Sequence, residues 1–238
     1  TAATGEPLEI IERRAEELGA DVFVCGEDFS AQLFFPKEGG QRVAFHSVVC
    51  REPEPFDLGL AGVYQAENAA LVIMAAKLLE REDARVTEHA IRVALRTVRH
   101  PARFEILMRE NLPVVIDGAH NPAGMRALRA GLDAYFPDLP RVFLLGILKD
   151  KDIDAMLAAL LRPGDQVITV RPDSERAAAA DVVAAIAAGM GLDTYACDDP
   201  AAALAEAQAR ARAGNALFVA AGSLYLVGGI RAMLMTGR

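Results

Sequence analysis

The sequence predicts an α/β protein whose second half is built on a mostly parallel sheet with right-handed crossovers. Three observations lead to this fold class. Hydrophobic residues make up 53% of the 238 residues, which is enough for a substantial core. From residue 104 onward, short β-branched or aliphatic runs alternate with segments of helical periodicity. Polar or glycine-containing turns follow these runs, as at the carboxyl ends of parallel strands.

Composition and charge limit the possible functions. No apolar run approaches the roughly 20 residues of a membrane helix, so we expect no membrane partner. A net charge of −8 argues against general nucleic-acid binding, because phosphate neutralisation needs a concentrated basic face. Cys25, Cys50 and Cys197 form no CxxC pair, which favours free thiols in a reducing cytoplasm. The histidines are too widely spaced for a metal motif, so we expect no metal ligands here.

The first predicted element is an amphipathic helix between Pro7 and Gly19. Its apolar residues recur at helical spacing: Leu8, Ile11, Ala15 and Leu18. A buried strand is predicted from Val22 to Cys25. The chain begins abruptly with a threonine and a helix, so we expect that the amino-terminal part of a larger protein is missing.

A β-hairpin is predicted next. Its strands run from Gln32 to Pro36 and from Arg42 to Val49, with Lys37-Glu38-Gly39-Gly40 between them. The acidic, proline-containing stretch from Arg51 to Asp57 is predicted to be a loop.

Gly62 to Asn68 then leads into a helix. The predicted apolar face of this helix consists of Leu71, Met74, Ala75, Leu78 and Leu79. Gln65 and Asn68 are three residues apart, so they share one side of the first turn. Two side-chain amides at this position either cap the helix or read the edge of a base such as adenine, and capping is the simpler interpretation.

A domain boundary is predicted near residue 99. A second helix, about Thr87 to Val98, ends before Pro101, and the pattern beyond it changes to alternating strands and helices. We therefore expect one domain over residues 1–98, a hinge linker over 99–103 and a second domain over 104–238. Arg103, at this hinge, is either a surface ion-pair partner or a bidentate donor to an anion.

The stretch PVVIDGAHNP, Pro113 to Pro122, carries the main candidate site. Its β-branched residues predict a buried strand, and Asn121-Pro122 predicts the start of a helix that runs to about Tyr135. Asp117 and His120 therefore lie in a strand-to-helix turn, where open α/β sheets bind ligands. In the alternative interpretation, Asp117 and Asn121 merely cap the helix and His120 is a surface residue.

The remaining elements continue the alternation. Strand Phe104 to Met108 is expected to form a hairpin with the strand at 114–116. The further strands are predicted at 142–146, 167–170, 194–196 and 216–220, and the further helices at 152–161, 177–188, 200–212 and 224–235.

The turns that follow the parallel strands are expected to meet at one edge of the sheet. Gly222-Ser223, at the start of the last helix, offers N–H groups and a hydroxyl to an anion such as a carboxylate. Lys149 to Asp152 is more simply a solvated turn that caps the following helix than a site of chemistry. The chain has neither a GxxxxGK[ST] P-loop nor a GxGxxG motif, which suggests that it holds half of a composite nucleotide site.

Several motifs together resemble the folylpolyglutamate synthase and dihydrofolate synthase enzymes of the Mur ligase superfamily. They are GVYQAENAA at 62–70, HPARFE at 100–105, VVIDGAHNP at 114–122, LLGILKDKD at 144–152 and AGSLYL at 221–226. The resemblance implies the C-terminal portion of the central ATPase domain, followed by a Rossmann-like glutamate-ligase domain. It also implies that the P-loop, the magnesium ligands and most of the folate site belong to the missing amino-terminal part.

The resemblance assigns roles on the ATP side. Asn68 resembles the adenine contact, and Gln65 is a second ATP-binding candidate. Arg103 is similar to the linker arginine that reaches the ATP phosphates. Asp117 resembles the carboxylate that meets the nucleotide and fixes domain closure.

The resemblance also implies a pocket for the incoming glutamate. His120 and Ser223 look like contributors to this pocket, and His120 joins Arg103 and Asp117 as a candidate for catalysis. The implied cofactors are ATP and Mg²⁺.

The implied reaction is the ATP-dependent addition of L-glutamate to folate or dihydropteroate through an acyl phosphate, by a cytoplasmic monomer. We expect this fragment to be inactive alone. One alternative is a cell-wall Mur-type amino-acid ligase, and another is a non-catalytic binding module that lacks its ATPase half.

Overall fold

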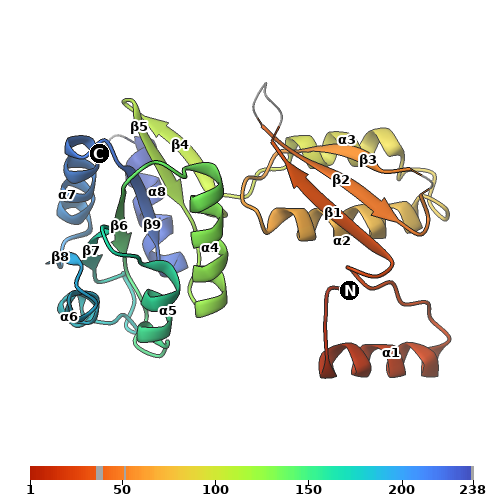
Figure 1. The fold of residues 1–238 in the computed structure, drawn as a ribbon, viewed down its shortest axis with the longest axis horizontal. Helices are drawn as coiled ribbons and strands as arrows, with labels where there is room; N and C mark the ends of the chain where they lie inside the picture. Colours follow the sequence, from red (N-terminus) through yellow and green to blue (C-terminus); the bar gives the residue numbers. More distant parts are fainter. Residues whose placement is uncertain (36–39, 51, 237–238) are drawn as a thin grey trace. The chain divides into compact units, whose positions relative to one another are not determined.

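The structure, a computed structural model, describes residues 1–35, 40–50 and 52–236. The chain divides into two compact units, Thr1–Arg99 and His100–Arg238 (Figure 1). Each unit has its own sheet. The units are therefore described one after the other.

The amino-terminal unit contains three helices and a three-stranded antiparallel sheet in the order β1-β2-β3 among its described residues. Its elements are α1 (Glu6–Leu18), β1 (Phe29–Phe34), β2 (Gln41–Ser47), β3 (Glu54–Leu58), α2 (Gln65–Leu79) and α3 (Glu88–Thr97). Phe45 and Phe56 from the sheet and Ile73 from α2 lie in one apolar cluster that covers a face of the sheet.

The predicted first helix, hairpin and helix near Thr87 are confirmed, with small changes of boundary. Thr87 caps α3 by accepting a hydrogen bond from Ala90 N–H at 3.1 Å, and Gly19 ends α1 in the left-handed region at φ 64°. Strand β1 begins three residues earlier than predicted, at Phe29. The predicted hairpin turn, except for Gly40, and the predicted strand end at Pro36 lie outside the described residues.

The predicted loop from Arg51 to Asp57 is wrong over residues 54–57, which belong to strand β3. Arg51 lies outside the described residues. Phe56 is almost fully buried and pairs with Val43 across the sheet, so its side chain fixes the segment to the core. Pro55 is compatible with β3 because an edge strand has one side without a partner strand. The prediction of a loop from proline and acidic residues alone therefore missed an edge strand.

The predicted strand from Val22 to Cys25 is also wrong. Only one isolated bridge, between Cys25 and Phe29, forms there. The backbone is instead paired locally: Cys25 N–H donates to Thr1 O at 2.7 Å, and Val24 N–H donates to Asp28 Oδ2 at 2.7 Å. These partners replace a sheet ladder, so the apolar run forms no strand.

The apolar face predicted for α2 is rotated relative to the observed one. The fully buried residues are Gln65, Ala66, Ala69, Ala70, Ile73 and Met74. Of the predicted face, Met74 is buried, Leu71 and Leu78 are partly buried against the same core, and Ala75 and Leu79 are exposed. Alanines make up half of the buried residues, and their small side chains let the helix approach the sheet closely. The larger side chain of Leu79 is mostly exposed.

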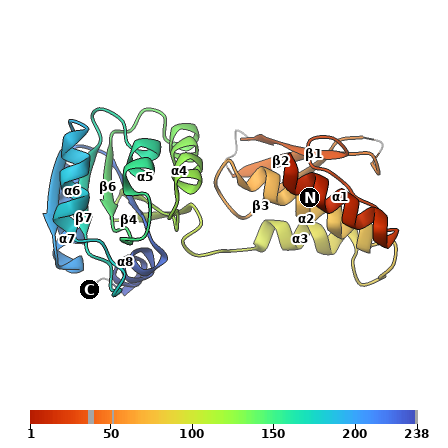
Figure 2. The same cartoon turned by 90° about the horizontal axis from the view of Figure 1, so that it is seen from below.

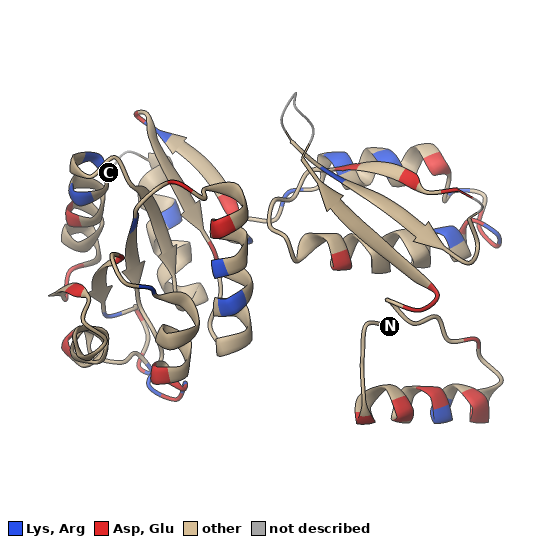
Figure 3. Ribbon diagram, viewed as in Figure 1, with Lys and Arg blue, Asp and Glu red and all other residues tan. Residues whose placement is uncertain are grey.

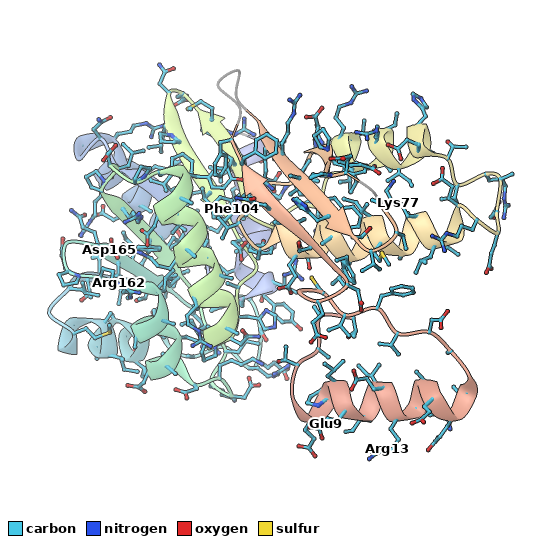
Figure 4. The ribbon with its side chains drawn as sticks, turned by 45° about the vertical axis from the view of Figure 1, so that its right-hand side comes forward. Glu9, Arg13, Lys77, Phe104, Arg162 and Asp165 are labelled. Carbon is cyan, nitrogen blue, oxygen red and sulfur yellow. The ribbon has the colours of Figure 1, made fainter. Side chains whose placement is uncertain are left out.

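Helix α1 has no buried residue, although its sequence is amphipathic. Ile10 and Leu18 are largely exposed. Charged residues, Glu9 and Arg13 among them, are spread along the helix (Figures 3 and 4).

The carboxy-terminal unit confirms the predicted α/β class. Its elements are β4 (Glu105–Arg109), β5 (Leu112–Ile116), α4 (Pro122–Tyr135), β6 (Arg141–Leu145), α5 (Ile153–Leu160), β7 (Gln166–Val170), α6 (Ala180–Gly189), β8 (Asp193–Cys197), α7 (Pro200–Ala213), β9 (Leu217–Ala221) and α8 (Leu224–Thr236). The sheet order is β4-β5-β9-β6-β7-β8, and only the hairpin pair β4-β5 is antiparallel.

Helices cover both faces of this sheet, which explains why its central strands are rich in apolar residues. Helices α7 and α8 pack with alternate strand residues such as Val114 and Phe218. Helices α4 and α5 pack together on the opposite face (Figure 2). Strands β5 and β9 carry no charged residue (Figure 3). No helix in the described ranges is long and apolar enough to cross a membrane.

At the amino edge of this sheet, charged groups pair with one another. Asp165 is buried and accepts hydrogen bonds from Arg162 N–H at 2.8 Å and from Arg129 Nη1 at 2.9 Å (Figure 4). Burial raises the pKa of Asp165, and these hydrogen bonds and the nearby arginines oppose that shift. The cluster joins α4 to the loop before β7, so it serves the fold.

Candidate functional site

The loops after β5, β9 and β6 meet at the carboxyl edge of the sheet, as the strand and helix alternation predicts. Gly222 N–H donates to Ala119 O at 3.0 Å, and Gly146 N–H donates to Ala221 O at 3.2 Å. Gly222 has φ 114°, and a Cβ there would lie 2.7 Å from Gly146 O. The close approach of these loops therefore requires glycine at position 222.

Asp117 lies at this edge directly after β5 and is buried, 4% exposed. Its Oδ2 accepts a hydrogen bond from Phe104 N–H at 2.8 Å, and its Oδ1 accepts one from Ala119 N–H at 2.7 Å. The helix α4 is capped by Asn121 instead, whose Oδ1 accepts from Gly124 N–H at 2.7 Å. The capping interpretation is thus right for Asn121 and wrong for Asp117, which joins the linker to the loop after β5.

The linker around Arg103 is held on both sides. Ala102 O accepts from Gly118 N–H at 2.7 Å, and Ala102 and Phe104 both have left-handed backbones, with φ 57° and 47°. Such conformations cost about 1–3 kcal/mol for residues other than glycine, so they persist only where the surroundings impose them. Arg103 lies between the two and is exposed, and no ion-pair or hydrogen-bond partner of its guanidinium is found among the described residues.

The ring of Phe104 anchors this linker in the core of the unit (Figure 4). It is fully buried and lies 5.2 Å from the ring of Tyr135, measured between centroids. A Cβ on Gly131 of α4 would lie 2.4 Å from Phe104 Cε2. The glycine in the middle of the helix therefore makes room for the anchoring ring.

Glu105 adds a second attachment that sequence reasoning missed, although the residue lies within the HPARFE motif. Its carboxylate binds Arg231 of α8, with Nε–Oε2 and Nη2–Oε1 distances of 2.8 and 2.9 Å, and accepts from Ala102 N–H at 3.0 Å. Burial alone would raise the pKa of Glu105, but the hydrogen bonds from Arg231 and Ala102 outweigh it and hold the pKa below its ordinary value. The linker is thereby tied to α8 as well as to α4.

His120 is half-buried in the turn after Asp117. Its Nδ1 lies 2.9 Å from Gly118 O. A carbonyl oxygen only accepts, so this contact assigns the donor role to Nδ1 and leaves Nε2 with no partner among the described residues. The ring is thus oriented by its own loop.

Ser223 is buried at the start of α8, 1% exposed. Its Oγ accepts a hydrogen bond from Leu226 N–H at 3.2 Å, so the hydroxyl caps the helix. Its O–H remains a possible donor. Asp117, His120 and Ser223 are therefore brought to one edge of one sheet by adjacent strands.

Gln65 and Asn68 belong to the amino-terminal unit. Asn68 Nδ2 donates to Gln65 Oε1 at 3.0 Å, and no side chain caps α2. Capping alone therefore does not account for the two amides. They line one end of an apolar groove of about 420 Å³ between α2 and α3, together with Leu60 and Val98.

The loop after β6 is a capping turn, as expected. Asp152 Oδ1 accepts from Ala155 N–H at 3.0 Å at the start of α5. Asp150 pairs with Arg176 of the loop after β7, and this hydrogen bond lowers the pKa of Asp150. The backbones of residues 177 and 178 pair with the loop after β6 and are not part of a helix. Helix α6 therefore begins at Ala180, three residues later than predicted.

We find no group of three or more His, Cys, Asp or Glu side chains that could hold a metal ion within residues 1–35, 40–50 and 52–236. No residue of the described chain is therefore assigned to magnesium.

A doubly wound α/β unit with a polar carboxyl edge is an architecture in which small molecules commonly bind at that edge. Comparison with known proteins is more specific. The family described as Mur ligase, glutamate ligase domain matches residues 102–224. The chain therefore belongs to the Mur ligase family.

Three of the similar proteins carry the names of enzymes that act on folates. A probable bifunctional folylpolyglutamate synthase/dihydropteroate synthase of Halobacterium salinarum is 38% identical over 173 residues, which is 72% of this chain and 20% of the relative. Folylpolyglutamate synthase of Thermotoga maritima has a TM-score of 0.79 at 28% identity, covering 99% of this chain and 53% of that one. The Mycobacterium tuberculosis folylpolyglutamate synthase, solved with ADP and AMPPCP, has a TM-score of 0.80 at 26% identity, covering 97% and 53%. The chain thus spans about half the length of these solved structures, and less of the curated relative.

Proposed function

We propose that the protein to which this chain belongs is an ATP-dependent ligase that adds L-glutamate to folate or dihydropteroate. The proposal rests on the hydrogen bond that Gly222 N–H, just before Ser223, donates to Ala119 O of the DGAHNP loop. Both loops belong to the part of the chain that matches the glutamate ligase domain family. The names of the relatives support the folate-type substrate, and the ADP complex of the mycobacterial relative supports ATP.

The proposed chemistry follows from the reactivity of carboxylates. A free carboxylate is a poor electrophile at neutral pH, whereas an acyl phosphate formed from ATP carries a good leaving group. The amine of L-glutamate then attacks the acyl carbon, an amide forms, and ADP and phosphate leave. The enzyme contributes by positioning the reactants and by stabilising the charge on the phosphoryl group.

Arg103 is the residue proposed to bind the phosphates of ATP. Its guanidinium is exposed and without a protein partner in the described part of the chain, and its backbone is held on both sides. A planar guanidinium suits bidentate binding of phosphate oxygens. Asp117 supports this role by accepting from Phe104 N–H, directly after Arg103. We therefore propose Arg103 as a catalytic residue and Asp117 as the residue that positions it and meets the nucleotide.

The incoming glutamate is proposed to bind near His120 and Ser223. Nε2 of His120, which has no partner in the part of the chain that the structure describes, would accept from the amine or take a proton that the amine releases. The O–H of Ser223 and the N–H groups at the start of α8 are donors to a carboxylate. These are complementary contacts for an amino acid.

The amino-terminal unit is proposed to be the end of an ATPase domain. Gln65 and Asn68 offer both donors and acceptors to the edge of a base, beside an apolar groove. Adenine is the base proposed for this site. Any magnesium that accompanies ATP is expected to be held by residues outside this chain.

We propose a cytoplasmic monomer that acts on small molecules. The test is a ligase assay of the full-length protein with ATP, L-glutamate and either dihydropteroate, a reduced folate or a UDP-linked cell-wall precursor. The expected result is one ADP per amide formed with a pteridine substrate. Amide formation with the UDP-linked precursor alone would instead identify a cell-wall ligase. ATP binding without any amide would identify a non-catalytic module.

A further inference from the structure

A cavity of about 650 Å³ opens in the carboxy-terminal unit beside the site described above. Its walls come from the loop after β7, the loop after β8 and helix α8. Arg171, Asp198 and Tyr225 are among the lining residues, and none of them has been assigned a role so far. The volume falls in the range of small-molecule sites, about 300–1,000 Å³.

The topology of the sheet places this cavity at a switch point. Strands β7 and β8 are parallel neighbours, but β7 continues into α6 and β8 continues into α7. Helix α7 packs in the cluster with α8, whereas the buried residues of α6 belong to the other face. Connections that leave adjacent strands toward opposite faces open a crevice at their carboxyl ends, which is where such sheets bind ligands.

Arg171 is the cationic residue of this lining. Its guanidinium has no hydrogen-bond or ion-pair partner in the part of the chain that the structure describes, although Asp173 is two residues away. A guanidinium binds a carboxylate through two parallel N–H···O bonds. An unpaired arginine on a cavity wall therefore suits a ligand with a carboxylate.

The other charges of the lining limit the kind of ligand. Asp173, Glu175 and Asp198 give the lining more negative than positive groups. A polyphosphate or a polyglutamate tail would meet repulsion there. A single carboxylate bound by Arg171 meets less of this repulsion than either of these multiply charged groups.

Two adjacent glycines in α8 supply an independent observation. Gly228 and Gly229 lie inside the helix, and a Cβ on either would meet no atom within 4 Å. Packing among the described residues requires neither glycine, although glycine weakens a helix relative to alanine. Gly229 lines the cavity, and Gly228 is not part of its lining. A methyl group at 229 would project toward the space that a ligand would fill.

We propose that this cavity receives the side chain of the incoming dicarboxylic amino acid, with Arg171 binding its distal carboxylate. Tyr225 and Gly229 form the wall along the methylene groups. This inference rests on the proposed ligase function and adds to it the residue that selects glutamate over neutral amino acids.

The first test is Arg171→Gln in the full-length protein, assayed with ATP, a folate and L-glutamate. We expect KM for L-glutamate to rise at least tenfold, with kcat and KM for ATP changed less than twofold. The preference for L-glutamate over L-glutamine should fall at least tenfold, because only the distal carboxylate differs. Arg162→Gln is the matched control, because Arg162 follows α5 near the amino edge of the sheet and should leave all these values unchanged (Figure 4).

The second test compares Gly229→Ala with Gly228→Ala. Both should raise Tm, because alanine favours the helix at both positions. Only Gly229→Ala should raise KM for L-glutamate, at least threefold. An unchanged KM in both Arg171→Gln and Gly229→Ala, in a protein that ligates glutamate, would overturn the inference.

Failure of the proposed function gives a different result. A wild-type protein that forms no amide bond contradicts the ligase proposal. Titration calorimetry of L-glutamate against the wild-type protein and Arg171→Gln then tests the assignment of the cavity separately from the ligase activity. Binding weakened at least tenfold by the substitution supports the assignment, and equal or absent binding in both proteins contradicts it.

Discussion

Replacing Asp117 by Asn tests whether this carboxylate holds the linker. Its two oxygens accept from Phe104 N–H and Ala119 N–H, at 2.8 and 2.7 Å. An amide has one oxygen, so one of these buried N–H groups would lose its acceptor, at a cost of about 1–3 kcal/mol. The other bond would lose its charge assistance, while the neutral amide is easier to bury, so we expect a net loss of about 2 kcal/mol.

The assay is differential scanning calorimetry of the chain, with attention to the transition of the carboxy-terminal unit. At about 4 °C per kcal/mol for a domain of this size, the expected fall in Tm is about 8 °C. Asn121→Ala, which removes the cap of α4 in the same loop, is the matched control and should cost about 1 kcal/mol. A Tm for Asp117→Asn within 2 °C of wild type, or above that of the control, would refute the reasoning.

Three further predictions concern the same linker. Gly131→Ala should destabilise the unit by about 1–3 kcal/mol in urea titrations, because its Cβ would lie 2.4 Å from the Phe104 ring; an unchanged midpoint would contradict the anchoring role. Glu105→Gln should lower Tm at pH 7 through loss of the Arg231 pair. A carboxylate with a lowered pKa in the folded state stabilises the folded protein above pH 4.5, its ordinary pKa, and this stabilisation is lost when the carboxylate is protonated. The difference in Tm between Glu105→Gln and wild type should therefore shrink as the pH falls below 4.5. A difference that does not change with pH would contradict this. In the full-length protein, Arg103→Ala should reduce turnover at least about tenfold, as expected for one charged transition-state contact; unchanged steady-state turnover would remove Arg103 from the mechanism.

Much of the fold could be read from local patterns. Helices with good caps, such as those begun by Thr87 and Asn121, were located to within a residue or two, because caps are chemical signals in the sequence itself. The alternation of strands and helices after residue 104 correctly predicted a mostly parallel sheet, because each crossover helix returns the chain to the same edge of the sheet. The failures came where neighbours in space decide: β3 depends on the burial of Phe56 against the first unit's core, and Val22–Cys25 depends on Thr1 and Asp28 as partners.

The candidate site divides in the same way. The sequence alone determined which loops would share an edge and that DGAHNP would lie among them, because strand alternation and turn chemistry are local. Only the tertiary structure decided that Asp117 bonds the linker instead of capping a helix, and that Arg103 is held between two left-handed residues. It also decided that Arg171 and Gly229 line one cavity. These facts depend on contacts between segments far apart in the chain, and no local pattern specifies which distant N–H, ring or cavity a side chain will meet.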